Sequence, residues 1–174
     1  MAKELDSVDL TRARELRGRG REVWVRRVSL LVVTAIAVLA LFNVFGQAPG
    51  EAVADSPTAT LIVSSPNQVR GGLLFQARFT IVAHQEIKNA TLNLGRGWAE
   101  GFTINTLEPS PSQETSDNGS LSFQLGDIPA RQAFTLYMQF QVNPVTVGSR
   151  SQVTELLDGS TGLVAVTRDM TVFP

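Results

Sequence analysis

The sequence predicts an all-β domain, an antiparallel β-sandwich, preceded by one N-terminal transmembrane α-helix. The first observation is a run of eighteen residues without a charge, from Val28 to Phe45. The second is a series of short segments after residue 57 in which apolar and polar residues alternate. Alternation with a period of two is typical of antiparallel strands that bury one face, and no segment after residue 57 has the apolar spacing of a helix.

The apolar run is long enough to cross a membrane as a helix. Eighteen helical residues extend about 27 Å, close to the roughly 30 Å of the hydrocarbon core. Trp24 precedes the run by one turn, where an amphipathic ring suits the headgroup region, and Arg26 and Arg27 can reach the same boundary with their charges. Glycines and prolines that follow the run stop a helix. We therefore assign residues 28–46 to a transmembrane helix.

The distribution of charge orients this helix. Residues 1–27 hold eight Lys and Arg against five acidic residues, whereas residues 47–174 hold seven against eleven. By the positive-inside rule we expect the basic arm, 1–27, in the cytoplasm and the C-terminal domain on the extracytoplasmic side of the cell membrane. Within the arm we expect a short polar helix around Asp9–Arg17 and a flexible segment at 18–20. The arginine-rich stretch 17–21 could bind nucleic acid or anionic lipid, but no aromatic residues interleave it, so we interpret it as a topology signal.

A cleaved signal peptide is the alternative to an anchor. Residues 52–54, Ala-Val-Ala, are typical of a cleavage site, and cleavage near Ala54 would release a secreted β-sandwich. Secretory apolar regions are usually about 7–15 residues long, whereas the run here is longer and follows a charged arm of 27 residues. We therefore favour a retained signal anchor, followed by a short extended linker at residues 47–57.

Eight segments of the expected sandwich domain, residues 58–174, have the composition of strands. These segments are 58–65, 72–84, 90–94, 101–107, 121–125, 133–142, 151–157 and 162–173. In the clearest of them, every second residue from Phe134 to Val142 is apolar. Seven to nine short strands without a helical segment indicate two packed sheets. The polar, proline-bearing segment 108–119 is expected to form a mobile surface loop, with a turn at 117–119.

A resemblance to a known family lies in residues 116–144, SDNGSLSFQLGDIPARQAFTLYMQFQVNP. This stretch resembles bacterial immunoglobulin-like domains of the DUF11 and CARDB kind, in which a strand ending in Leu-Gly is followed by a short turn with proline and an alternating strand. The upstream stretches VRGGLLFQARFTIV and ATLNLGRGW are similar to earlier strands of that pattern. The resemblance covers residues 60–144 and implies an immunoglobulin-like sandwich, a fold that usually serves in cell-surface or envelope proteins for interaction or spacing. Arg131 stands where the family usually has glycine, and His84 where it commonly has asparagine.

The residues that could support catalysis or bind a metal are few. The chain has no cysteine, which excludes disulfides, a thiolate zinc site and a cysteine nucleophile. His84 is the single histidine, too few for a histidine-based zinc site. A serine, this histidine and an aspartate could form a triad, but the chain contains no G-x-S-x-G motif. We therefore predict a protein that is not an enzyme and binds neither metal nor cofactor.

Two further motifs are explained by turns. The glycines of GRGWAEG, 95–101, lie between two expected strands with no helix after them, which does not favour phosphate binding. The stretch SDNGS, 116–120, is not followed by the carboxylates of a calcium loop, so a hairpin turn explains it better.

Two residues are candidates for contact with a partner. Trp98 lies between glycines and either caps the core or serves as an exposed aromatic anchor. Asn43 places an amide in the apolar helix, where such a group often finds a partner on a neighbouring helix.

These observations favour a non-catalytic, single-pass membrane protein. We expect its extracytoplasmic sandwich, its helix, or both to bind and stabilise a larger envelope or membrane assembly. A cell-surface adhesion or cell-wall-binding module is the alternative. The expected partners are the lipid bilayer and a protein of the membrane or envelope, and no nucleic acid or small-molecule substrate is indicated.

Overall fold

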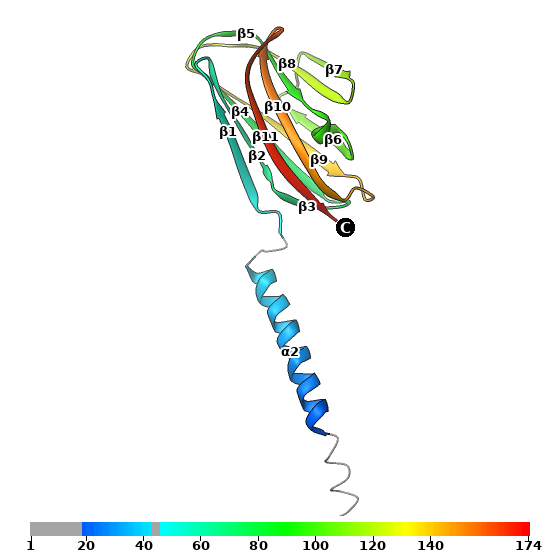
Figure 1. Ribbon diagram of the computed structural model, residues 1–174. Coiled ribbons are helices and arrows are strands. Elements are labelled where there is room, and N and C mark those ends of the chain that lie inside the picture. The colour runs from blue at the N-terminus through cyan, green and yellow to red at the C-terminus, as the bar shows by residue number, and fades with distance from the viewer. Residues whose placement is uncertain (1–18, 43–45) are drawn as a thin grey trace, which may run out of the picture. The chain divides into compact units, whose positions relative to one another are not determined.

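The computed structural model describes residues 19–42 and 46–174, and the chain divides into two units after residue 45. The first unit contributes one helix, α2 (Arg19–Leu41). The second, Gly46–Pro174, is a β-sandwich with one additional helical turn, α3 (Arg96–Ala99) (Figure 1). Residues Arg21–Leu41 form a helix that is long and apolar enough to cross a membrane, judged by length and composition.

Helix α2 begins earlier than predicted. The three residues assigned to the membrane boundary, Trp24, Arg26 and Arg27, lie within the helix, and Arg19 and Gly20, which we expected to be flexible, are helical. Arginine and glutamate are good helix formers, and no proline interrupts this stretch, so the helical backbone continues into the charged region.

The C-terminal end of α2 also differs from the prediction. The helix ends at Leu41, rather than at residue 46. The helix-packing candidate Asn43 and the arm helix expected at Asp9–Arg17 lie outside the described residues.

The sandwich consists of two sheets with eleven strands among the described residues. In order across the first sheet, the strands are β1 (Pro49–Asp55), β2 (Ala59–Pro66), β4 (Leu74–Ala83), β9 (Ala133–Val142) and β6 (Phe102–Glu108). In order across the second sheet, they are β3 (Gln68–Arg70), β11 (Thr161–Phe173), β10 (Gly148–Asp158), β5 (Ile87–Leu94), β8 (Ser120–Ile128) and β7 (Gln113–Asp117). Neighbouring strands are antiparallel, apart from β3, which runs parallel to β11.

This strand order confirms the predicted fold class. The series β2–β4–β9–β6 corresponds to the A-B-E-D sheet of an immunoglobulin fold, and β11–β10–β5 corresponds to its G-F-C sheet. The β7–β8 hairpin is added beside β5. The second unit is therefore an immunoglobulin-like β-sandwich.

The core follows the alternation that predicted it. In β9, Leu136, Met138, Phe140 and Val142 are buried, and the residues between them face outward. Burying a side chain of this size contributes about 1.5–3 kcal/mol to stability. Phe79 of β4 faces the core from the same sheet, and Leu92 and Leu156 of the second sheet fill its opposite side.

Strand β1 corrects the prediction for residues 47–57. We expected an extended linker, but Pro49–Asp55 pairs with β2 through all seven residues, from Pro49 opposite Pro66 to Asp55 opposite Thr60. The segment is extended as expected, but it is part of the first sheet. Its small side chains provide a weak apolar pattern, which is why the alternation was not sufficient to predict a strand.

Strand β7 corrects the prediction of a mobile loop at residues 108–119. The segment 108–119 contains a strand, although every side chain of β7 is exposed and polar. Pairing with β8 through five residues orders it. The turn at Asn118–Gly119 was predicted correctly: both residues have positive φ, 50° and 81°, as a two-residue hairpin turn requires.

Candidate binding groove at the open edge of the sandwich

At one edge of the sandwich, each of the two sheets ends in a strand that has no neighbouring strand on its outer side. β6 is the last strand of the first sheet, and β7 is the last strand of the second. An open groove of about 390 Å³ lies between them, lined by residues 104–107 of β6, residues 114–116 of β7, and Leu121 and Phe123 of β8. Figure 1 shows β6, β7 and β8 together at one edge of the domain.

The groove has an apolar floor and a polar rim. Phe123 is 2% exposed, and the other apolar lining residues, Ile104, Leu107 and Leu121, are half-buried and pack against the core. The exposed rim consists of Asn105, Thr106, Glu114, Thr115 and Ser116. Clefts that bind ligands commonly combine an apolar lining with a few polar groups that fix orientation.

Strand β7 presents free backbone groups along this groove. The hairpin turn 118–119 makes Asp117 and Ser120 the closing pair. On an antiparallel strand, residues that exchange hydrogen bonds with the neighbouring strand alternate with residues that do not. The backbone N–H and C=O groups of Glu114 and Ser116 therefore point away from β8, toward the free edge.

Strand β6 is a less regular edge. Its register with β9 shifts between Ile104 and Thr106, so Asn105 is an extra, bulged residue. A bulge disturbs the hydrogen-bond ladder and increases the local twist, which makes an edge strand a poorer template for another strand. β7 is thus the more regular of the two free edges, and Glu114 is the charged residue of the groove lining.

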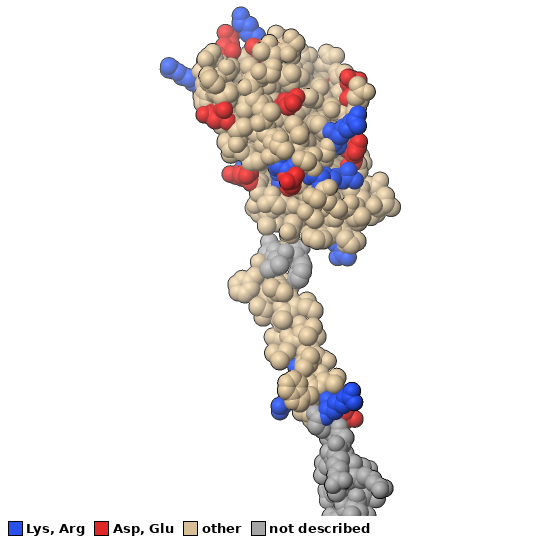
Figure 2. Space-filling model, in the orientation of Figure 1, with Lys and Arg blue, Asp and Glu red and all other residues tan. Residues whose placement is uncertain are grey.

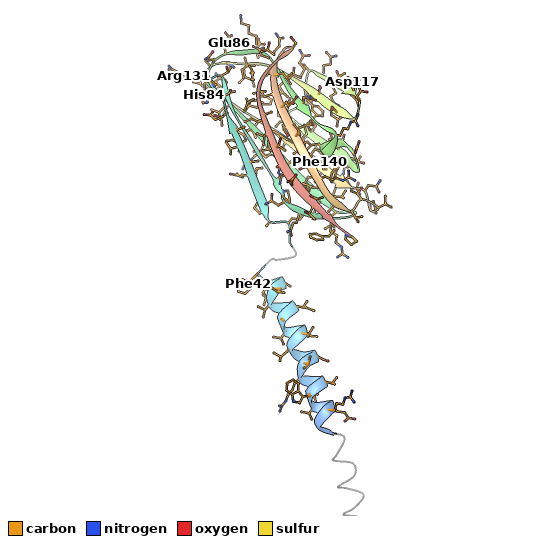
Figure 3. All side chains as sticks on the ribbon, in the orientation of Figure 1. Phe42, His84, Glu86, Asp117, Arg131 and Phe140 are labelled. Carbon is orange, nitrogen blue, oxygen red and sulfur yellow. The ribbon has the colours of Figure 1, made fainter. Side chains whose placement is uncertain are left out.

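His84 belongs to a second polar cluster, at the end of the sandwich where β1 turns into β2. The Nε2 atom of His84 lies 2.9 Å from Thr60 Oγ1 and 3.2 Å from Asp55 Oδ1, and the Thr60 hydroxyl donates a hydrogen bond to Asp55. These hydrogen bonds, that from Thr60 first, hold the pKa of Asp55 below its ordinary value of 3.8. Figure 3 shows His84 at the same end of the domain as Glu86 and Arg131.

The geometry of this cluster does not fit a catalytic triad. In a triad the carboxylate and the hydroxyl bind opposite nitrogens of the imidazole, which relays the proton between them. Here Thr60 and Asp55 both lie next to the same nitrogen of His84 and bind each other directly. Within residues 19–42 and 46–174, no group of three or more acidic or histidine side chains comes together as a metal site.

Trp98 is a core residue, so of the two roles considered for it, a cap of the core and an exposed anchor for a partner, the structure excludes the exposed anchor. Its side chain is 0% exposed, and its ring lies 5.2 Å from that of Phe79 and 5.4 Å from that of Phe140. Its indole Nε1 donates a hydrogen bond of 3.0 Å to Thr154 Oγ1. A partner cannot contact this ring in the folded domain, so Trp98 caps the core.

Arg168 is a buried cation that the sequence analysis did not single out. Its side chain lies 5.9 Å from the Trp98 ring, and the residue is 7% exposed. One terminal nitrogen donates to the carbonyl oxygens of Ser65 at 2.8 Å and Pro66 at 2.9 Å, and to Asn67 Oδ1 at 2.9 Å. These acceptors form the corner at which the chain passes from β2 in the first sheet to β3 in the second.

The partners of Arg168 are neutral oxygens. The other terminal nitrogen lies 3.4 Å from Gln152 Oε1, a residue that is itself 0% exposed. No carboxylate of the described residues lies within ion-pair distance of this guanidinium. Burial lowers the pKa of Arg168. Four hydrogen bonds to a chain corner and to Gln152 indicate a structural role, in which the arginine connects the two sheets.

The glycines of GRGWAEG were expected to form a turn between two strands without a helix, but one helical turn, α3, begins within the motif, and close packing explains Gly97. A Cβ atom at Gly97 would collide with the backbone oxygen of Ser151, so the turn could not approach β10 with any other residue there. Gly101 has a φ of 83°, in the left-handed region that favours glycine.

The pattern in β11 contains a signal for the buried arginine. Val166, Arg168, Met170 and Val172 are all buried and alternate with residues that are exposed or, at Thr171, half-buried. The same alternation that predicts a strand therefore places Arg168 on the inward face. The groove has no comparable signal, because it depends on which strands lie at the edges.

No family model matches the chain, and no curated protein matches it. Among solved structures, the cohesin-named CaCohA2 from Clostridium acetobutylicum is 17% identical with a TM-score of 0.48, covering 68% of this chain and 93% of that one. The CARDB domain of a Pyrococcus furiosus protein, solved with di-metal ions, is 12% identical with a TM-score of 0.44, covering 68% and 90%. A non-cellulosomal cohesin from Archaeoglobus fulgidus is 10% identical with a TM-score of 0.36, covering 63% and 88%. These likenesses concern the fold alone, and no functional conclusion depends on them.

Proposed function

We propose that the protein is a non-catalytic, single-pass membrane protein whose extracytoplasmic β-sandwich binds an extended segment of a partner protein along strand β7. The groove is the observation that carries this proposal, because it combines an apolar floor with a regular strand edge. An extended peptide that adds to such an edge gains main-chain hydrogen bonds, and its alternate side chains fill the adjacent pocket. The protein would thereby hold together a larger envelope assembly.

The lining of the groove indicates the chemistry of the partner segment. Every second side chain of the segment would point to the apolar floor at Leu107, Leu121 and Phe123. A basic side chain on this segment would suit Glu114 at the rim, because opposite charges favour encounter and register. We therefore expect an extended, alternating segment that carries at least one Lys or Arg.

Strand β1 supports a retained anchor over a cleaved signal peptide. Cleavage after Ala54 would remove six of the seven residues that pair with β2, Pro49–Ala54. Without β1, strand β2 would become a free edge, and the cleaved chain would lack one strand of its first sheet. A helix that stays attached keeps the sandwich complete.

Crosslinking across the groove tests the binding site. A photoreactive residue at Asn105, in the full chain in its native membranes, is expected to form an adduct with the partner protein. Ser116→Pro removes an outward N–H that β8 does not use, and edge strands tolerate proline at such positions. We expect this substitution to abolish the adduct, whereas Ser116→Ala, which keeps the N–H, retains it. Equal adduct in both variants would show that strand addition at β7 is wrong.

The same crosslink separates recognition by the sandwich from recognition by the helix. Replacing residues 28–45 with polyleucine keeps an apolar span but removes its specific surface. The adduct at Asn105 is expected to survive this replacement. If it disappears while the protein stays in the membrane, the helix carries recognition and the groove is secondary.

Protease accessibility tests the anchor and its orientation. Protease added to intact spheroplasts is expected to digest residues 47–174 and to leave an N-terminal tag protected. A mature protein whose mass begins at Asp55 would contradict the anchor, because it would have lost the helix.

A further inference from the structure

One end of the sandwich, called here the proximal end, is where the chain from residue 46 joins β1. Three other segments meet at this end: the β3–β4 turn (71–73), the β9–β10 loop (143–147) and residues 173–174, of which Phe173 ends β11. The backbone N–H of Gly71 donates to Phe173 O at 2.8 Å, and that of Gly72 donates to Val142 O at 3.0 Å. The side-chain amide of Gln47 lies 3.3 Å from Leu74 O, so the start of the domain belongs to the same end.

Large apolar side chains project from the proximal end. The most exposed are Val145, 82%, and Val147, 56%, and three others are each 48% exposed: Leu73, Leu74 and Phe173. Single exposed apolar residues are ordinary on a protein surface, but a cluster in adjoining segments marks an interaction surface.

The proximal end also carries very little charge. In segments 46–50, 66–74, 142–149 and 170–174, Arg70 is the one Lys, Arg, Asp or Glu. The β5–β6 connection, whose Gly101 carbonyl accepts a hydrogen bond from the Asn143 N–H, adjoins these segments and adds Arg96 and Glu100. On the face seen in Figure 2, the end from which the chain leaves toward residue 46 is tan apart from one basic group, and the other charges gather farther away.

The opposite end, called the distal end, has the reverse character. Its turns are 55–58, 84–88, 127–132 and 158–161, and they contain Asp55, Glu86, Lys88, Asp127, Arg131 and Asp158. Both ends belong to one domain and consist of connections between strands. Fold requirements therefore do not explain why six charged residues lie in the distal turns and only one in segments 46–50, 66–74, 142–149 and 170–174.

We propose that the proximal end rests on the lipid surface of the membrane, with Val145, Val147 and Phe173 inserted at the headgroup boundary. This inference rests on the proposed function, because it requires that α2 stays in the bilayer. Seven residues, 42–48, separate α2 from β1 in sequence, and a chain of that length spans at most about 25 Å. The end at which the chain joins the sandwich is therefore confined to the neighbourhood of the lipid headgroups.

The chemistry of the proximal end fits this occupant. Apolar side chains gain free energy when they enter the boundary between headgroups and acyl chains. Arg70 is exposed, and a basic residue beside the membrane is attracted by anionic lipid phosphates. An acidic group at this position would be repelled. Segments 46–50, 66–74, 142–149 and 170–174 contain none, and Glu100, on the adjoining β5–β6 connection, lies 4.0 Å from Arg150.

The absence of cysteine from the chain makes a direct test available, because a single introduced cysteine takes a unique label. Full-length Val145→Cys, Ser160→Cys and Leu31→Cys each carry an environment-sensitive fluorophore. Each is placed, one chain per disc, in nanodiscs of phosphatidylcholine and phosphatidylglycerol whose acyl chains are brominated. Ser160 is an exposed distal-end control, and Leu31 lies in α2 and reports on the anchor itself.

We expect blue-shifted emission and bromine quenching for the labels at Val145 and Leu31, and neither effect at Ser160. Quenching at Leu31 without quenching at Val145 would overturn the docking of the proximal end and leave the anchor intact. A water-exposed label at Leu31 would overturn the anchor, and with it the basis of this inference. Bromine is carried by the acyl chains alone and each disc holds one chain, so quenching of the label reports contact with lipid.

A charge variant provides an independent check. In a chain labelled at Leu73→Cys, the pair Val145→Asp and Val147→Asp places two carboxylates at the proximal end. We expect loss of the quenching at residue 73, whereas Ser160→Asp at the distal end leaves it unchanged. Quenching that persists in the double variant would contradict the proposal, and retained near-ultraviolet circular dichroism verifies that the variant is folded.

Discussion

The proximal and distal ends of the sandwich place their polar groups in opposite ways. At the proximal end the surface is apolar, while one arginine, Arg168, is buried beneath the corner between β2 and β3. At the distal end the charges are on the surface, and the Asp55–Thr60–His84 cluster is exposed. Both clusters connect β2 to another strand. The difference shows that the sheets determine the core, whereas the surroundings of each end determine where charge is tolerated.

The largest expected effect on stability is that of removing the buried arginine, Arg168, compared with removing an exposed one. Arg168→Ala leaves the carbonyl oxygens of Ser65 and Pro66 without their donor and removes the side chain that covers Trp98. We expect a loss of about 3 kcal/mol or more in the free energy of unfolding, because a buried group left without a partner costs about 1–3 kcal/mol. Urea denaturation of residues 46–174, followed by circular dichroism, measures it.

Arg78 is the matched control for that experiment. It is a half-exposed arginine that pairs with Glu51 at 3.5 Å, and exposed ion pairs contribute about 0–1 kcal/mol. Arg78→Ala is therefore expected to change the free energy of unfolding by less than about 1 kcal/mol. Equal losses of unfolding free energy in the two variants would mean that the hydrogen bonds around Arg168 stabilise the fold no more than an exposed ion pair does.

The next largest effect is expected from adding a side chain to a tightly packed glycine, compared with a glycine that has free space around it. Gly97→Ala would place a Cβ atom against the Ser151 carbonyl, and overpacking of this kind costs about 1–3 kcal/mol. A Cβ atom at Gly162, near the distal end, would have no neighbour within 4 Å, and the φ of Gly162 is ordinary, so Gly162→Ala is expected to be neutral. Thermal denaturation of both variants measures the difference, and a Gly97→Ala protein as stable as the parent would contradict the packing argument.

A smaller effect is expected at Arg131 of the distal end. Its φ of 65° lies in the left-handed region, at the position where the domains that this sequence resembles were expected to have glycine. A left-handed conformation costs a non-glycine residue about 1–2 kcal/mol, and the flexibility of glycine in the unfolded chain offsets part of the gain. Arg131→Gly should therefore stabilise the domain by no more than about 1 kcal/mol, measured by chemical denaturation. A clear destabilisation would indicate that the Arg131 side chain makes a needed contact.

The smallest effect concerns the exposed cluster and depends on pH. Hydrogen bonds lower the pKa of Asp55 below 3.8 in the folded protein. Its ionised form therefore stabilises the fold at pH values above the pKa that Asp55 has in the unfolded chain. This contribution is lost as the pH falls through the folded pKa. The parent should therefore melt slightly above Asp55→Asn at pH 7, and the two melting temperatures should converge once the pH falls below the folded pKa of Asp55. A difference that does not change with pH would contradict this origin.

Much of the fold follows from local patterns, and the exceptions have physical reasons. The alternation in 133–142 places four buried residues on one face of β9, because a strand turns its side chains to alternate sides whatever it pairs with. β7 could not be predicted in this way, because its side chains are all exposed and polar. Pairing with β8 alone makes it a strand, and pairing is a property of two segments.

The same distinction applies to the candidate sites. The position of Arg168 on the inward face of β11 is contained in the sequence, since Val166 and Met170 are in phase with it. Its acceptors at residues 65–67 are about a hundred positions away, and only the crossing of the chain between sheets brings them together. The burial of Trp98 was likewise decided by packing between the sheets, because its neighbours in the sequence are the glycines that allow α3 to approach β10.

The sequence by itself determined an apolar helix-forming segment, an alternating β domain after it, the hairpin turn at Asn118–Gly119, and a chain without cysteine. These properties depend on residues close together along the chain, through side-chain direction, turn geometry and composition. The tertiary structure decided the rest: that residues 49–55 complete a sheet, that β6 and β7 are left as free edges around a groove, and that four segments form one apolar end. Each of these depends on which distant segments meet, and that is set by the packing of the whole core.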